Sequence, residues 1–156
     1  LETVELPISL TTTAQSLHDE LALASKELIL LTLEKIVSGT IVSKKQPDTG
    51  IVYAEKLMKD EGQLDFAKSA KELDCMIRGM TPQVSVWYED LSMRVKIIRA
   101  TPVQNFEKRL TVGKSLIQDS YLYIQCGSGM LRVDMVQPEG KKVLEIGEFL
   151  KGYRPL

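Results

Sequence analysis

The sequence predicts two unlike parts: an α/β piece made of one strand and one long helix, and a mainly-β barrel joined to it by a linker. Three observations support this prediction. Apolar residues recur at helical spacing near the start of the chain, turn-forming residues then replace any regular pattern, and short alternating segments follow Pro82. The 156 residues, 44% of them hydrophobic, suffice for one ordinary domain or for a small domain plus a piece of another.

The predicted α/β piece covers residues 1–39. Its first nine residues alternate between apolar and polar, as in a half-buried strand, and Pro7 places that strand near an edge or an end. The apolar side of the alternation consists of Val4, Leu6 and Ile8. A helix is expected from Ala14 to Val37, with candidate N-caps among the threonines at 11–13 and with Gly39 at its end.

The helix expected over residues 14–37 is apolar around much of its last two turns. The residues that widen its apolar stripe are Ile29, Leu30, Leu33 and Ile36. A helix that is apolar on several sides needs cover on more than one side, so we expect a packing partner that lies outside this sequence. An exposed leading strand, Leu1–Ile8, can also pair with another chain, and self-association through this strand and the helix is a second possibility.

A linker is expected over residues 40–66, because this stretch is the least regular in the chain. Lys44–Gly50 is rich in turn-forming residues, and Lys56–Gly62 is strongly charged. Both features favour an irregular connection over a packed element.

The C-terminal domain, residues 67–156, is predicted to open with a short helix. Ser69-Ala70-Lys71-Glu72 has the sequence of a capping box, in which the Ser and Glu side chains satisfy each other's free backbone N–H groups. The helix is expected to end at Gly79, just before Thr81-Pro82. The side chains expected to face inward are Leu73, Met76 and Ile77.

Five short β segments follow the helix. They are Val84–Tyr88, Met93–Ala100, Leu110–Ile117, Tyr121–Cys126 and Leu131–Val136. The predicted breaks between them are Glu89-Asp90, Thr101–Arg109, Gln118-Asp119-Ser120 and Gly127-Ser128-Gly129. This strand count and size predict a small closed barrel of the oligonucleotide-binding (OB) type, although a sandwich edge or an SH3-like barrel fits nearly as well. A final helical turn or two is expected over Glu145–Lys151.

Composition excludes several classes of protein. No stretch approaches the roughly 20 apolar residues of a membrane span, and Glu2 and Glu5 stand where a secretory signal would be basic. Cys75, Cys126 and the single histidine, His18, are too few for a disulfide framework or a zinc site. We therefore expect free thiols, no metal and a cytoplasmic protein.

A catalytic Cys–His pair is conceivable, formed by Cys75 or Cys126 with His18 as the base. Cys75 lies beside the apolar face of the short helix and Cys126 ends a strand, so both thiols are expected to be buried and inert. Gly127-Ser128-Gly129 lacks the following helix and lysine of a phosphate loop, and a tight turn between strands explains it.

Charge is distributed unevenly around a net value of −1. Residues 1–80 hold nine Lys/Arg against thirteen Asp/Glu, whereas residues 81–156 hold eleven against eight. The second part is therefore the better candidate for contact with a polyanion. Scattered surface charge explains the same numbers about as well.

Several stretches, spread over nearly the whole chain, resemble successive motifs of the methionyl-tRNA formyltransferase family in the family's order and spacing. They are Leu17–Ala22, Tyr53–Phe66, Ile77–Pro82, Gln137–Lys142 and Phe149–Arg154. Two departures stand out: Phe66 replaces the usual Trp, and Gln83-Val84-Ser85-Val86 replaces a Trp-Pro-Gly-Ala run. The second departure falls at the opening of the first predicted barrel strand.

The resemblance implies transfer of a formyl group from 10-formyltetrahydrofolate to the methionine of initiator tRNA. In the family, an Asn, a His and an Asp of an N-terminal Rossmann-like domain polarise the carbonyl and manage protons. None of the three aligns with a residue of this chain, and His18 falls in the helix motif instead. Residues 1–39 would then be the tail of the catalytic domain, and we expect this chain to bind no folate and to be inactive alone. A fragment of a sugar-nucleotide formyltransferase is the rival interpretation.

Five lysines are the candidate contacts to the tRNA backbone: Lys56, Lys59, Lys114, Lys141 and Lys142. An ammonium group on a long stem meets phosphate oxygens without demanding one geometry, and each contact releases condensed counterions. Such contacts supply affinity and orientation with little reading of sequence. Four aromatic residues in the predicted strands could stack on unpaired bases, although core packing or cross-strand pairing is favoured for them: Trp87, Tyr88, Tyr121 and Tyr123.

Overall fold

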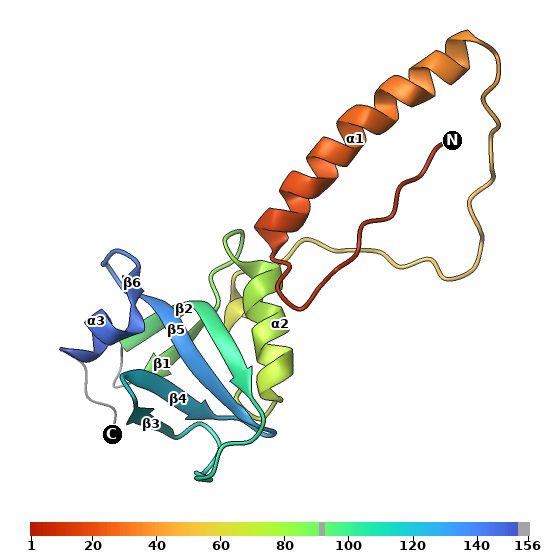
Figure 1. The fold of residues 1–156 in the computed structure, drawn as a ribbon. Helices are drawn as coiled ribbons and strands as arrows, with labels where there is room; N and C mark the ends of the chain where they lie inside the picture. The colour runs from red at the N-terminus through yellow and green to blue at the C-terminus, as the bar shows by residue number, and fades with distance from the viewer. Residues whose placement is uncertain (91–92, 153–156) are drawn as a thin grey trace. The chain divides into compact units, whose positions relative to one another are not determined.

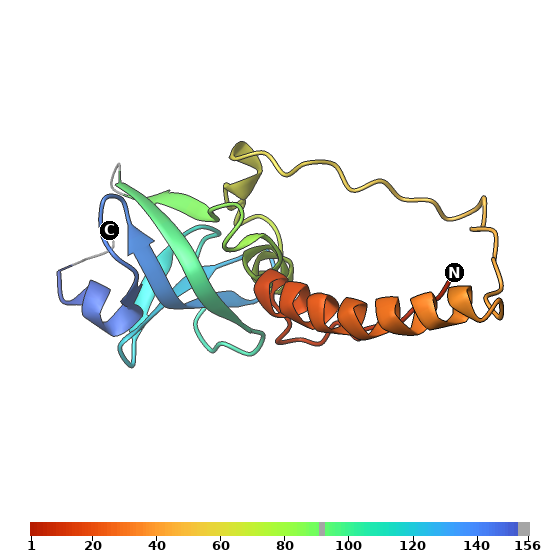
Figure 2. The same cartoon turned by 90° about the horizontal axis from the view of Figure 1, so that it is seen from above.

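The structure is a computed structural model that describes residues 1–90 and 93–152 (Figures 1 and 2). It divides into two compact units, residues 1–56 and residues 57–156. Residues 57–66, which the sequence analysis assigns to the linker, lie in the second unit, where Leu64 is part of the core.

The first unit contains one helix, α1 (Ala14–Val37), with the bounds expected from the sequence. Thr13 is its N-cap, and a capping box joins the Thr13 and Ser16 side chains to each other's backbone N–H groups. The helix ends at Ser38, and Gly39 follows in the left-handed conformation with a φ of 70°.

The strand predicted over the first nine residues is wrong for this structure. This segment carries no ladder, because a strand exists only through hydrogen bonds to a neighbour and the first unit offers none. An ion pair of 2.8 Å between Lys35 Nζ and Glu2 Oε1 joins the segment to α1. Helix α1 itself buries no residue. Its large exposed apolar side chains are Leu21, Leu23, Ile29, Leu30, Leu31, Leu33, Ile36 and Val37.

The second unit is built on one antiparallel sheet that curves into a half-barrel. Its strands are β1 (Trp87–Asp90), β2 (Met93–Val103), β3 (Ser115–Gln118), β4 (Tyr121–Gln125), β5 (Met130–Pro138) and β6 (Leu144–Glu145). The order is β1-β2-β5-β4-β3, with β6 also paired to β5. The predicted closure of the barrel is therefore wrong: in the part of the chain described, β1 and β3 are opposite ends of the sheet. Both are only four residues long, and a cavity of about 320 Å³ that includes Phe66 and Tyr88 in its lining lies between them.

Some strands end at other residues than expected, because residues predicted to form turns pair with a neighbouring strand instead. Glu89 and Asp90 are not a break but the last pairs of the β1–β2 ladder, and the connection at 91–92 lies outside the described residues. Strand β2 continues to Val103, because Thr101 pairs with Arg132 of β5. The segment before Ser115 turns instead of extending, with Gly113 at a φ of 82°.

The predicted turns at 118–120 and 127–129 are confirmed. Asp119 and Ser120 both have positive φ, as a tight two-residue hairpin connection requires. Gly127, Ser128 and Gly129 connect β4 to β5.

Helix α2 (Ala70–Met80) lies against one side of the sheet and packs on β2 and β5 (Figure 1). Its capping box of Ser69 and Glu72 is confirmed, and it runs one residue beyond Gly79 because Gly79 does not adopt a positive φ. Leu73 and Ile77 are at most 1% exposed. Their core neighbours from the sheet are Val95, Ile97, Leu122, Ile124, Leu131, Val133 and Val136.

The final helix, α3 (Ile146–Leu150), is confirmed within the segment expected for it and contacts β4, β5 and β6. It buries Ile146 and Phe149 in the same core as α2. The sheet therefore encloses one continuous apolar interior, and charged side chains are left to its outer face.

The turn at Gly127 gives the first test of this packing. Gly127 N donates to the carbonyls of Phe66 (2.9 Å) and Lys68 (3.0 Å), and a Cβ at this position would collide with the backbone oxygen of Ala67. We predict that Gly127→Ala lowers the free energy of unfolding by about 1–3 kcal/mol, because backbone cannot move aside as a side chain can. Gly147→Ala, in α3 with open space around its Cβ, should be neutral or slightly stabilising. Urea unfolding of both variants measures the difference, and equal stabilities would contradict the close packing.

Candidate nucleic-acid interface

The outer face of β2 carries a row of cations that follows directly from strand alternation. Val95 and Ile97 are fully buried, so the side chains between and beside them point outward. A bulge after Ile97 shifts the pattern by one residue and keeps the next cation outside. Three cations of β2 and one arginine of the paired strand β5 form a group that we call the basic face. Its members are Arg94, Lys96, Arg99 and Arg132.

Among the described residues, the three arginines of the basic face are each paired with a carboxylate, whereas Lys96 is not. Arg99 Nη2 lies 3.4 Å from Glu145, and Arg132 Nε lies 2.8 Å from Asp134 Oδ1. The hydrogen bond to Asp134 raises the pKa of Arg132 above its usual range. Lys96 forms no ion pair in the part of the chain that the structure describes.

A polar row crosses the sheet at the end of β1. Gln63 bridges to Trp87, Trp87 pairs with Lys96 of β2, and Lys96 pairs with Gln137 of β5. Opposed residues of a ladder project to the same side of the sheet, so these four side chains share the outer face. The guanidinium carbon of Arg94 lies 3.8 Å from the centroid of the Trp87 ring.

Three of the five predicted lysines lie at this same end of the sheet. Lys141 and Lys142 are exposed in the turn between β5 and β6, where Gln137 Nε2 donates to the Lys141 carbonyl at 3.0 Å. Lys59 is exposed at the start of the 3₁₀ turn Asp60–Gly62, which leads into Gln63. The end of the sheet therefore adds three mobile cations to the basic face.

The strand ladder does not place Lys114 or Lys56 beside these three lysines. Lys114 is exposed just before β3, at the opposite end of the strand order from β1, and it lines the cavity between β1 and β3 together with Glu89 and Asp90. Lys56 is exposed and is the last residue of the first unit, so its distance from the sheet is not defined.

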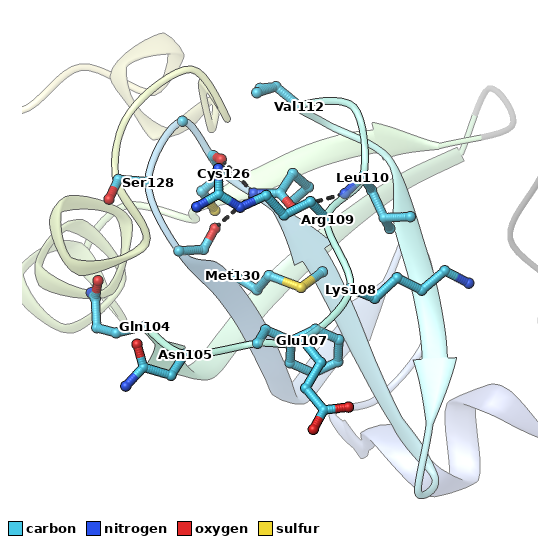
Figure 3. A pocket seen from close by; sticks show the side chains of 14 residues that line it. Gln104, Asn105, Glu107, Lys108, Arg109, Leu110, Val112, Cys126, Ser128 and Met130 are labelled. Carbon is cyan, nitrogen blue, oxygen red and sulfur yellow. Dashed lines mark hydrogen bonds between the residues drawn. The ribbon is translucent and has the colours of Figure 1, made fainter.

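A hollow of about 620 Å³ lies between the loop that follows β2 and the turn that follows β4 (Figure 3). The Gln125 side chain holds the two together: its Oε1 accepts from Leu110 N at 3.1 Å, and its Nε2 donates to the carbonyls of Cys126 and Gly129. Lys108 and Arg109 are exposed at its rim, on the same loop as Lys114. This end thus carries a second, smaller group of cations.

The cations of β2, Lys108 and Arg109 were not predicted from the sequence. The sequence Met93–Arg99 alternates charged and apolar residues, and that alternation is the signal that could have identified the basic face. A lysine in a loop is conspicuous, whereas a charge inside a strand is easily taken for ordinary surface.

Of the aromatic candidates, Tyr88 and Tyr123 make the packing contacts that the sequence favoured. Tyr88 is buried, and its ring packs edge-on against the ring of Phe66. The ring centroids of Tyr123 and Phe106 are 4.7 Å apart. Tyr121 lies under the Arg132 guanidinium at 4.7 Å.

Comparison with known proteins decides the family. Residues 56–154, most of the chain, match the family described as formyl transferase, C-terminal domain. The chain belongs to this family. The methionyl-tRNA formyltransferase of Rickettsia felis is 42% identical over 141 residues, covering 90% of this chain and 45% of the relative. That of Rickettsia bellii is 38% identical over 153 residues, covering 98% and 48%. The resemblance found in the sequence, to the C-terminal part of these enzymes, is thereby confirmed.

The chain spans about half the length of the curated relatives that it matches. Among solved structures, HypX from Aquifex aeolicus in complex with tetrahydrofolic acid superimposes with a TM-score of 0.65. Identity there is 18%, over 97% of this chain and 28% of HypX, so the likeness shows the fold alone. Among the described residues, no helix is long and apolar enough to cross a membrane.

The two thiols of the chain lie in different environments. Cys126 is buried as expected, and desolvation raises its pKa to about 11. The expectation that Cys75 is buried is wrong: it is exposed on α2, because the buried face of that helix is formed by Leu73 and Ile77. His18 is exposed on α1, and no group of three or more metal-ligating side chains occurs in residues 1–90 and 93–152.

We predict that iodoacetamide at pH 8 modifies one thiol per folded chain, Cys75. Cys126 stays protonated and inaccessible until the pH approaches 11 or the chain unfolds, because only the thiolate reacts. Ionisation favours the unfolded state, where the thiol has its ordinary pKa, so this site lowers stability as pH rises from about 9 to 11. Mass spectrometry of the wild type and of Cys75→Ser checks the assignment. Rapid labelling of folded Cys75→Ser would contradict it.

Proposed function

We propose that this chain holds tRNA as the C-terminal part of a methionyl-tRNA formyltransferase. The observation that carries the proposal is the basic face, which adjoins Lys59, Lys141 and Lys142 on a domain of the family whose curated relatives bear that name. The relatives' name also favours this function over the sugar-nucleotide enzyme.

The chemistry of these groups suits an RNA backbone. Lys96 and the exposed lysines of the β5–β6 turn can each meet a phosphate, and counterion release makes such contacts favourable at low salt. Arg99 and Arg132 are already paired with carboxylates, so we assign them a smaller share. We retain Lys56 and Lys114 as further contacts, and we add Lys108 and Arg109 beside Lys114.

Three finer assignments belong to the same proposal. The half-barrel is an OB-type barrel left open between β1 and β3. Residues 1–39 are the tail of the catalytic domain, residues 40–56 the linker that remains of the expected stretch 40–66, and residues 57–156 the tRNA-binding domain of a cytoplasmic enzyme. Formyl transfer from 10-formyltetrahydrofolate is carried out by residues outside this chain, because the Asn, His and Asp expected from the family align with none of its residues.

The exposed apolar residues of α1 suggest how the chain joins the rest of such an enzyme. Leu30, Leu33 and Ile36 are each about half exposed, and burying the remaining half of each side chain contributes about 1 kcal/mol apiece. We propose that the catalytic domain covers them. When it is absent, a second copy of the chain is the alternative cover, through residues Leu1–Ile8 and α1.

We predict that the chain binds initiator tRNA weakly at physiological salt and much more tightly in dilute buffer. The double variant Lys141→Gln/Lys142→Gln should weaken binding and reduce the slope of log K against log salt by about 1–2, because two phosphate contacts are lost. Lys26→Gln, on α1, is the control and should change neither quantity. Fluorescence anisotropy of labelled tRNA measures both.

The same preparation should transfer no formyl group from 10-formyltetrahydrofolate to methionyl-tRNA. Transfer by the chain alone would refute the assignment of catalysis to other residues. Absence of binding at about 20 mM salt, while a longer protein that includes this chain binds, would refute the role of the basic face.

A further inference from the structure

Trp87 and Arg94 form a stacked pair on the outer face of the sheet. The guanidinium carbon lies 3.8 Å from the centre of the ring, which is van der Waals distance for two flat groups. Trp87 is only half-buried, and it is the one tryptophan of the chain. Its partner in the β1–β2 ladder is Lys96, so the pair adjoins this cation of the basic face.

The Arg94 side chain remains partly open to solvent beside the indole. One side of the guanidinium is covered by the indole, while the Arg94 side chain as a whole is 47% exposed. Its ion pair with Glu89 is long, at 3.8 Å, and Glu89 is 61% exposed. Such a pair holds the arginine only weakly, because water screens it. The contact with the indole is therefore the stronger of the two that hold this guanidinium in place.

We propose that Trp87 and Arg94 form a stacking platform for one unpaired nucleobase of the bound RNA. The inference rests on the proposed function and adds a specific contact to it. A guanidinium plane supported by an aromatic ring offers a base both π-stacking and a cation. Lys96 lies beside the platform for the adjoining phosphate, and the amides of Gln63 and Gln137 lie in the same polar row.

The platform selects single-stranded RNA over duplex. A base inside a duplex has both faces covered by its neighbours, whereas an unpaired base in a loop or at an end presents one. The basic face alone would bind both forms, because it meets phosphates only. Preference for unpaired bases is therefore the property that separates the platform from its surroundings.

The emission of Trp87 tests the proposal directly, since no other tryptophan contributes. The probes are a single-stranded RNA of about 12 nucleotides and a duplex with the same number of phosphates, with binding followed separately by anisotropy. We expect the single strand to quench Trp87 and the duplex to bind with little change in its emission. Initiator tRNA should also quench it.

Variants separate stacking from charge. Arg94→Lys keeps the charge and loses the plane, so single-strand affinity should fall about three- to tenfold with an unchanged salt slope. Arg78→Lys, the same exchange on α2 and outside the basic face, is the matched control and should leave RNA affinity unchanged. Trp87→Leu should lower the affinity for the single strand about tenfold, whereas Trp87→Phe should retain most of the wild-type affinity. Arg94 is largely exposed, so its variant remains informative if Trp87→Leu fails to fold.

Three results would overturn the platform. One is binding of single-stranded RNA with unchanged Trp87 emission. Another is an equal loss of affinity for duplex and single strand in Arg94→Lys. The third is the absence of binding to any RNA, which would also remove the proposed function. The first two leave that function intact, so the two failures are distinguishable.

Discussion

The structure depends on β5, the strand that pairs with β2 on one side and β4 on the other. Three of its nine residues, Leu131, Val133 and Val136, are buried in the same interior as α2. A strand held on both edges has no freedom to slip, since a shift of one residue would turn its apolar face outward. That fixed register also places Arg132 beside Thr101 and Gln137 beside Lys96. The outer face of the domain is thus a consequence of how its core is packed.

Sequence patterns predicted the elements whose signals are local. The capping box at Ser69, the helix over 14–37 and the turn at Gly127 all depend on residues close together in the chain, and each was found where expected. Closure of the barrel depends on contacts between β1 and β3, and no short pattern reports whether two distant strands meet. For the same reason Leu1–Ser9 has the alternation of a strand without a neighbour to pair with.

The candidate site was predicted only in part. Lys59, Lys141 and Lys142 are conspicuous in the sequence, and the fold places them at one end of the sheet. Lys114 is equally conspicuous, but it precedes β3, the strand at the opposite end of the strand order from β1. The importance of Arg94 and Lys96 becomes visible only in the β1–β2 ladder, which places Trp87 opposite Lys96 and in contact with Arg94. Spacing along the chain cannot express that arrangement, because it combines residues of two strands.

We propose that RNA binds across the outer face of β1 and β2 and the turn after β5. Amide hydrogen exchange with and without initiator tRNA in dilute buffer tests this proposal most directly, because it locates the contact on the intact chain. We expect slowed exchange in residues 59–63, 87–99 and 137–142, with no change in α1. Protection confined to α1, or spread evenly over the chain, would contradict it.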